Sequence, residues 1–222
     1  MFRYSSRHIW VTMVVVLGAV LLVAGCNQDE PSIQIPPPDP PVTEPRTPEE
    51  LLERFRVAYE NMDVEGYLAL LEPDFLFLLQ SETSREFPEL GGALDLVEEE
   101  RIHRRLFSGE AVVDPGGETR PALVTMAIQE FKALDTWNST NDSVRFPDAA
   151  WAPFDIDLLF DCGVEFSTYK TTGAARIYIR NHIRMVNGKA VPYYLLAGMI
   201  DLTRSDKSVE HTPWGLIKGF YR

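Results

Sequence analysis

Two long strand-like segments near the C-terminal end constrain the fold more than any other feature of this sequence. Ala174 to Val186 and Ala190 to Leu202 are rich in β-branched and aromatic residues, and the Asn187-Gly188 pair between them is typical of a tight hairpin turn. The preceding segment, Phe154 to Thr168, places an apolar residue at every second position as far as Phe166. These three segments predict neighbouring antiparallel strands of one sheet.

Helical patterns precede these strands. Thr47 is a good N-cap, and apolar residues then recur at helical spacing as far as about Asn61. Asp63 caps a shorter second helix, which we expect Pro73 to end. The segment from Ala93 to Phe107 predicts a third helix.

Three further segments complete the predicted sheet. Asp74 to Gln80 reads as a short apolar strand, Arg120 to Lys132 as a longer one, and Trp214 to Tyr221 as the last. Helices that come first and antiparallel strands that follow indicate the α+β class.

The N-terminal 26 residues resemble a bacterial lipoprotein signal. Arg3 and Arg7 precede the apolar run Val11 to Val23, which has the length of a signal-peptide core and is short for a membrane span. The run leads into LVAGC, which resembles the lipobox, where a peptidase cuts before the cysteine and the thiol becomes acylated. We therefore expect residues 1–25 to be a signal peptide and Cys26 to be lipidated. An ordinary transmembrane anchor with a chance cysteine is the alternative.

The expected location follows from the same signal. Two or three acyl chains anchor a protein firmly in a membrane. Asn27 stands where an aspartate would indicate retention in the inner membrane. In a cell with two membranes we therefore expect the outer membrane, with the protein facing the periplasm.

Residues 26–47 read as a Pro-rich tether and residues 48–222 as one domain. Eight of the sixteen prolines lie between Asn27 and Pro48, and such a segment forms an extended spacer. Removing residues 1–25 takes two basic and no acidic residues from the 21 basic and 33 acidic ones, which leaves a net charge of −14. This charge argues against a nucleic-acid partner. Cys162 is left without a disulfide partner and is interpreted as a buried, inert thiol.

One stretch carries a family resemblance. AYENMDVEGYLALLEPDFLF, Ala58 to Phe77, resembles the start of the superfamily that holds nuclear transport factor two, ketosteroid isomerase and the SnoaL-like polyketide cyclases, also described as cystatin-like. The resemblance implies a cone-shaped domain in which a curved, mainly antiparallel sheet wraps around N-terminal helices and encloses a pocket. It also implies where catalytic residues would lie. Phe55 stands at the position of the isomerase tyrosine and Leu79 at that of its aspartate, and neither transfers a proton.

The residues favour binding over catalysis. The sequence contains no HExxH, CxxC or GxSxG pattern and no phosphate loop, so no cofactor and no metal are expected. We interpret the chain as a membrane-anchored envelope lipoprotein whose domain binds a small apolar ligand or a protein partner. One alternative is an isomerase, cyclase or hydrolase that uses relocated acid and base residues. Another is an assembly lipoprotein whose pocket is filled by its own side chains.

Four residues are the pocket candidates: Tyr59, His103, Asn181 and Tyr194. Asn181 shares the strand face of the neighbouring isoleucines, and counting outward from the hairpin turn places Tyr194 opposite it. Asn181 could instead bond only to Tyr194. His103 could be a pocket acid or base, or a surface histidine paired with Glu99.

The strand from Ala174 to Val186 also carries an arginine stripe. Arg176, Arg180 and Arg184 lie on one face, and a turn near Thr171-Thr172 would bring them close to acidic residues of the preceding strand. We expect Asp161 and Glu165 to neutralise them. The residues between and opposite the arginines form a candidate contact surface for a homodimer: Tyr178, His182, Tyr193, Leu195 and Met199. The hairpin count pairs Tyr178 with Ala197 and Arg176 with Met199. The alternative is that the Ser81 to Gly117 insertion or the chain end covers this face within one chain.

Overall fold

A computed structural model describes residues 44–114, 116–139, 144–166, 168–203 and 212–222. The expected signal peptide, Cys26 and nearly all of the Pro-rich tether lie outside these residues. No helix within the described ranges is long and apolar enough to span a membrane.

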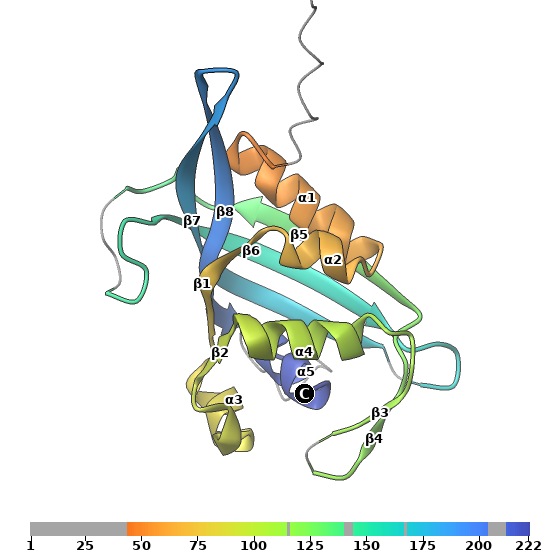
Figure 1. Ribbon diagram of the computed structural model, residues 1–222. Coiled ribbons are helices and arrows are strands. Elements are labelled where there is room, and N and C mark those ends of the chain that lie inside the picture. Colours follow the sequence, from red (N-terminus) through yellow and green to blue (C-terminus); the bar gives the residue numbers. More distant parts are fainter. Residues whose placement is uncertain (1–43, 115, 140–143, 167, 204–211) are drawn as a thin grey trace, which may run out of the picture. The chain divides into compact units, whose positions relative to one another are not determined.

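Six strands form one curved, mixed sheet in the order β2-β1-β8-β7-β6-β5 (Figure 1). Their bounds are β1 Leu71–Leu78, β2 Ala93–Asp95, β5 Thr125–Ala133, β6 Ala150–Asp161, β7 Tyr169–Val186 and β8 Lys189–Thr203. Strands β1 and β8 pair in parallel, and the other neighbours are antiparallel. Two short strands, β3 (Val112–Val113) and β4 (Thr119–Arg120), form a separate ribbon. The structure confirms the predicted α+β class.

The helices that carry the site lie on one face of this sheet (Figure 1). Their bounds are α1 Pro48–Glu60, α2 Val64–Leu68, α4 Leu96–Leu106 and α5 Trp214–Phe220, and a short helix α3 (Ser81–Glu86) and the 3-10 turn η1 (Pro88–Leu90) lie nearby. The predicted caps are confirmed: the Thr47 side chain accepts from Glu50 N and the Asp63 side chain from Gly66 N. Helix α2 ends at Leu68, before the predicted Pro73, because the chain turns there into β1.

The C-terminal segment was predicted as a strand and is helix α5. Six of its seven residues are buried, namely Trp214, Gly215, Ile217, Lys218, Gly219 and Phe220, so neighbouring elements enclose the helix. Two glycines allow the helix to pack closely. A Cβ added at Gly215 would lie 2.7 Å from Leu79, and one added at Gly219 would lie 2.6 Å from the Phe87 ring.

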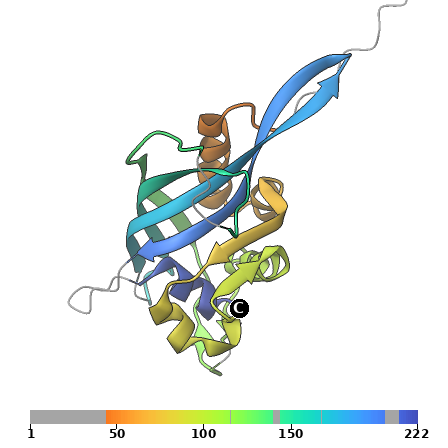
Figure 2. The same cartoon turned by 90° about the vertical axis from the view of Figure 1, so that its left-hand side faces the viewer.

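Strands β7 and β8 form the predicted hairpin, whose tip projects beyond the rest of the sheet (Figure 2). Asn187 has a φ of 49° and Gly188 a φ of 75°, as the expected turn requires. The predicted pairing is confirmed from the turn as far as Ile179. Beyond it a bulge shifts the register by one residue, so Tyr178 lies opposite Gly198 and not Ala197.

The expected partners of the arginine stripe are wrong. Strand β6 ends at Asp161, and Phe160 pairs with Tyr169, so the turn comes before the predicted Thr171-Thr172 and Glu165 lies within it. The arginines have other partners: Arg180 bonds to Asp74 at 2.7 Å, Arg184 to Glu44 at 2.5 Å, and the Arg176 guanidinium lies 4.6 Å from the centre of the Trp151 ring.

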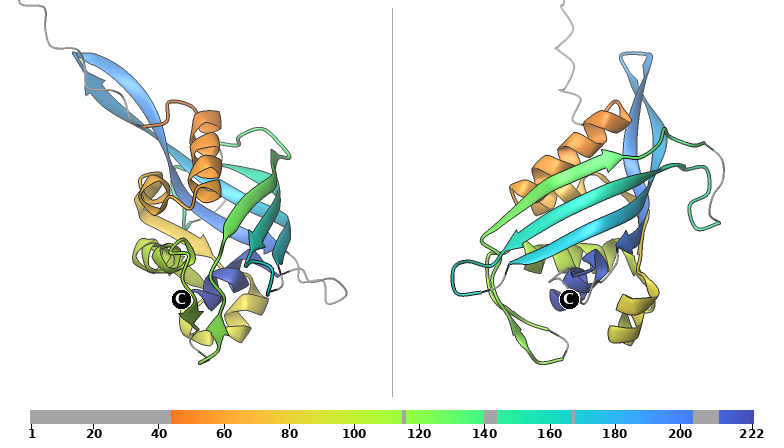
Figure 3. Two further views of the ribbon diagram at one scale, coloured as in Figure 1. Left: turned by 90° about the vertical axis from the view of Figure 1, so that its right-hand side faces the viewer. Right: turned by 180° about the vertical axis from the view of Figure 1, so that it is seen from behind.

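The outer face of the sheet is covered in part by the chain between β5 and β6. Phe146 in this connection stacks on Tyr178, with ring centroids 4.1 Å apart, and Ala149 and Ala197 complete a small buried cluster. Figure 3 shows this face of β5, β6 and β7 with the helices behind it. At Tyr178 the covering residue is therefore Phe146, which belongs neither to the Ser81 to Gly117 insertion nor to the chain end.

Candidate functional site

Five polar side chains meet in the space between the sheet and the helices. They are Tyr59 of α1, Tyr67 of α2, Glu99 and His103 of α4, and Lys218 of α5, and each is 0% exposed. We call them the buried polar cluster. Lysine and glutamate are almost never fully buried unless they are paired, so this cluster is the most unusual chemistry in the described part of the chain.

A hydrogen-bond chain fixes the tautomer of His103. Its Nδ1 lies 2.9 Å from the Glu99 carbonyl oxygen, and because a carbonyl only accepts, Nδ1 carries the proton. Nε2 then accepts from the Tyr59 hydroxyl at 2.6 Å. Burial lowers the pKa of His103 to about 3 although Glu99 opposes this shift. The imidazole is therefore neutral at physiological pH, and burial raises the pKa of Tyr59 well above its usual value.

Glu99 is the acceptor at the centre of the cluster. Its Oε1 accepts from the Tyr67 hydroxyl at 2.6 Å and from the Lys218 ammonium, whereas the buried Oε2 has no hydrogen-bond partner among the described residues. Burial acts to raise the pKa of Glu99, but Lys218, His103 and Tyr67 together outweigh it and the pKa is lowered. Burial lowers the pKa of Lys218, and Glu99 opposes that shift. The two groups form a buried ion pair.

Aromatic rings fill the space around the cluster. The Trp214 ring lies 5.9 Å from Tyr59, 6.2 Å from Phe55 and 5.3 Å from Phe77, measured between centroids, and meets all three edge to face. Phe55 also stacks on Phe131 at 5.2 Å. The space around these residues, between the sheet and the helices, is thus filled by the chain's own side chains.

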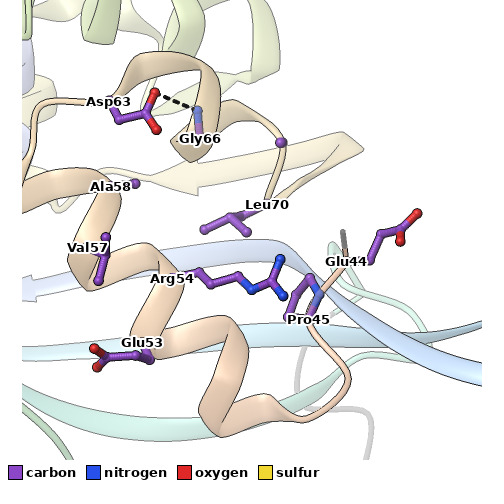
Figure 4. Close-up of a pocket in the computed structure, with 10 residues that line it drawn as sticks. Glu44, Pro45, Glu53, Arg54, Val57, Ala58, Asp63, Gly66 and Leu70 are labelled. Carbon is purple, nitrogen blue, oxygen red and sulfur yellow. Dashed lines mark hydrogen bonds between the residues drawn. The ribbon is translucent and has the colours of Figure 1, made fainter. Parts of the chain in front are cut away.

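An open groove lies outside this core, between α1, α2 and the end of the tether. Its volume is about 380 Å³, and its lining residues are Glu44, Pro45, Glu53, Arg54, Val57, Ala58, Asp63, Gly66, Ala69 and Leu70. Figure 4 shows Pro45, Arg54 and Leu70 around the opening. The charged rim is internally paired, since Glu44 bonds to Arg184 and Arg54 to Glu50.

The structure brings together only two of the four predicted pocket residues. Tyr59 and His103 are joined directly, and the predicted pairing of His103 with Glu99 exists but is buried rather than at the surface. The inward orientation predicted for Asn181 is wrong. Asn181 does lie opposite Tyr194, but it is exposed, as is Ile183, which is two residues nearer the hairpin tip.

The predicted contact surface is also reduced. Tyr178 is covered by Phe146, and the bulge places Met199 opposite Ile177, inside the core. His182, Tyr193 and Leu195 remain half-buried, and His182 stacks on Tyr193 with centroids 5.1 Å apart.

Tyr67 and Lys218 were not among the residues predicted for the site, and Glu99 was expected only as a partner of His103 at the surface. The sequence signal for Lys218 was its spacing from Trp214, which is one helical turn. No group of three or more His, Cys, Asp or Glu side chains in the described ranges is arranged to hold a metal ion.

Comparison with solved structures finds distant likenesses. A candidate polyketide cyclase from Pseudomonas putida KT2440 has a TM-score of 0.38 and 13% identity over 72% of this chain and 91% of its own. An NTF2-like protein of unknown function in nutrient uptake, from Rhodospirillum rubrum, has a TM-score of 0.37 and 12% identity over 68% and 92%. A Mycobacterium tuberculosis protein of unknown function has a TM-score of 0.44 and 8% identity over 78% of this chain and 80% of its own.

No protein-family model and no curated protein matches the sequence. A fold by itself does not determine a function, which depends on the residues of the site.

Proposed function

We propose that this chain is a lipid-anchored envelope protein whose α+β domain binds a partner and does not catalyse a reaction. The packed interior carries this proposal. The residues that could transfer protons are fully buried and bonded to one another, so a substrate has no direct access to them.

The external groove is where we place the binding. Val57 and Ala69 line the groove and are exposed. Ala58 and Leu70 also line it and are buried apolar residues. Grooves of a few hundred cubic ångströms with apolar linings are typical of small-molecule sites and of pockets that receive one side chain of a partner. A small apolar molecule or an apolar side chain fits this chemistry.

The groove is tested with the uncharged apolar dye N-phenyl-1-naphthylamine. The wild-type domain should bind the dye, and Ala69→Trp, which places an indole in the groove, should abolish binding. Ala133→Trp at the exposed end of β5 is the matched control. Equal binding by the Ala69→Trp and control variants would reject the groove as the site.

The anchor is proposed from the sequence, since Cys26 lies outside the described residues. A Cys26→Ser variant expressed in a bacterial host should lose acylation and leave the membrane fraction. Retention of the variant in membranes would point to an uncleaved apolar segment and contradict the lipoprotein proposal.

We also propose that the domain self-associates through His182, Tyr193 and Leu195. Light scattering on the wild type and on Tyr193→Glu tests this proposal. The wild type should be a dimer and the variant a monomer, and a monomer in both proteins rejects it.

One observation favours an enzyme as the second candidate. Tyr59 and His103 share a hydrogen bond of 2.6 Å, and Nδ1 of His103 lies 3.7 Å from the Glu99 carboxylate. Titratable groups converge in this way in active sites. This function requires the interior to open. Modification of His103 by diethyl pyrocarbonate in the folded protein, at the rate of the half-buried His182, would support the enzyme.

A further inference from the structure

We propose that the interior of the cone is a binding site for an organic ammonium ion that carries an aromatic arm, and that α5 occupies this site as an intramolecular ligand. The aromatic ring of Trp214 and the ammonium of Lys218 stand in for the two parts of such a molecule. This site is separate from the external groove.

The walls of the site are built without α5. Phe55, Tyr59 and Tyr67 contact one another edge to face or tilted, with centroids 4.5 to 5.9 Å apart. His103 holds the Tyr59 hydroxyl, and its ring lies 4.2 Å from that of Tyr67. These contacts join α1, α2 and α4 without any residue of α5.

The Lys218 ammonium and the Trp214 ring of α5 both contact groups that commonly bind ligands. The Lys218 Nζ contacts the Glu99 carboxylate and lies 3.9 Å from the centre of the Phe77 ring. A carboxylate together with an aromatic face is the arrangement that binds organic cations. Trp214 meets rings from both α1 and β1 at their edges. One end of the site thus selects a cation and the other an aromatic ring.

The spacing of the two groups defines the ligand class. Nζ of Lys218 lies 5.2 Å from the centre of the Trp214 ring, a separation that a short alkyl chain can bridge. An arylalkyl ammonium ion therefore presents the same ring and charge in one molecule. Tryptamine, with its indole ring and two-carbon arm, is the simplest probe.

A purely structural role explains this arrangement less well. A buried ion pair is often no more stabilising than two apolar side chains of the same volume, and Lys218 is surrounded by Phe77 and Trp214, which suit an apolar residue. Glu99 Oε2 is buried without a hydrogen-bond partner among the described residues, although buried polar atoms are nearly always satisfied. The carboxylate thus has an unused acceptor that a ligand with several N–H donors could fill.

The test uses the full-length double variant Trp214→Ala/Lys218→Ala, in which α5 lacks both the indole ring and the ammonium group. Tryptamine should bind this double variant and raise its melting temperature, and 3-ethylindole, which lacks the amine, should bind about tenfold more weakly or worse. Adding Glu99→Gln should remove the preference for the amine. A folded double variant that binds neither compound, or binds both equally, overturns the proposal.

A single variant provides a second test if the double variant does not fold. Lys218→Ala lacks the last three carbons and the ammonium of the lysine, which propylammonium supplies. Added propylammonium should raise the melting temperature of Lys218→Ala and leave that of Lys218→Met unchanged, because methionine fills the same volume. Equal effects on both variants show that the amine acts without entering the site, and overturn the proposal.

Discussion

His103 should make the domain sensitive to mild acid. The neutral ring accepts from Tyr59 through Nε2 in the folded state, and protonation would remove that acceptor in a site without water access. The folded pKa is about 3 and the ordinary value is 6.5. Because the unfolded chain binds the proton more readily, stability falls as the pH drops below 6.5 and continues to fall until it reaches the folded pKa.

The magnitude follows from the same two values. Each pH unit between them costs about 1.4 kcal/mol, so lowering the pH from 7 to 5 should cost about 2 kcal/mol through this residue. That is a large share of the stability of a typical domain, about 5–15 kcal/mol. The assay is urea unfolding of the soluble domain at both pH values.

His103→Gln is the matched variant. Its amide oxygen can accept from the Tyr59 hydroxyl, as Nε2 does, but it does not titrate. The free energy of unfolding of the variant should therefore change less between pH 7 and pH 5 than that of the wild type, by about 2 kcal/mol. The same change in both proteins would refute the assignment of a buried, neutral His103.

Three further predictions concern the interior and its covering. Glu99→Gln leaves the Lys218 charge buried without its partner and should cost about 3–5 kcal/mol in urea unfolding, and adding Lys218→Met should restore much of it; a cost unchanged by the second substitution contradicts the ion pair. Gly198→Ala places a Cβ 2.0 Å from the Phe146 ring and should cost about 1–3 kcal/mol, whereas an unaffected melting temperature would show that Phe146 does not lie there. Burial raises the pKa of Cys162 to about 11, so iodoacetamide at pH 8 should alkylate it only after unfolding, and rapid alkylation of the folded protein would be the adverse result.

The elements predicted correctly were those with local chemical signals. Thr47 and Asp63 cap their helices with side-chain oxygens, and Asn187-Gly188 adopts the positive φ angles of its turn. These signals act within a few residues of chain, so a sequence displays them directly.

The elements predicted wrongly depend on contacts between distant segments. The bulge next to Tyr178 has no local signal, and it moved Met199 from the surface to the core. Helix α5 is seven residues long with two glycines, a composition that also fits a strand, and its helical form is supported by packing inside the cone. The spacing of Trp214 and Lys218 places them on one face of a helix, but no neighbouring residue shows that this face is buried. Glu99, which lies 119 residues away, makes the burial of Lys218 tolerable.

The central claim is that the chain's own C-terminal helix closes the interior, and lysine reactivity tests it most directly. Brief acetylation of the folded, full-length protein, followed by peptide mass spectrometry, compares Lys218 with the exposed Lys132 and Lys189. We predict that both exposed lysines are acetylated while Lys218 is protected until the protein unfolds. Acetylation of Lys218 at the rate of the exposed lysines would show an open interior and contradict the account.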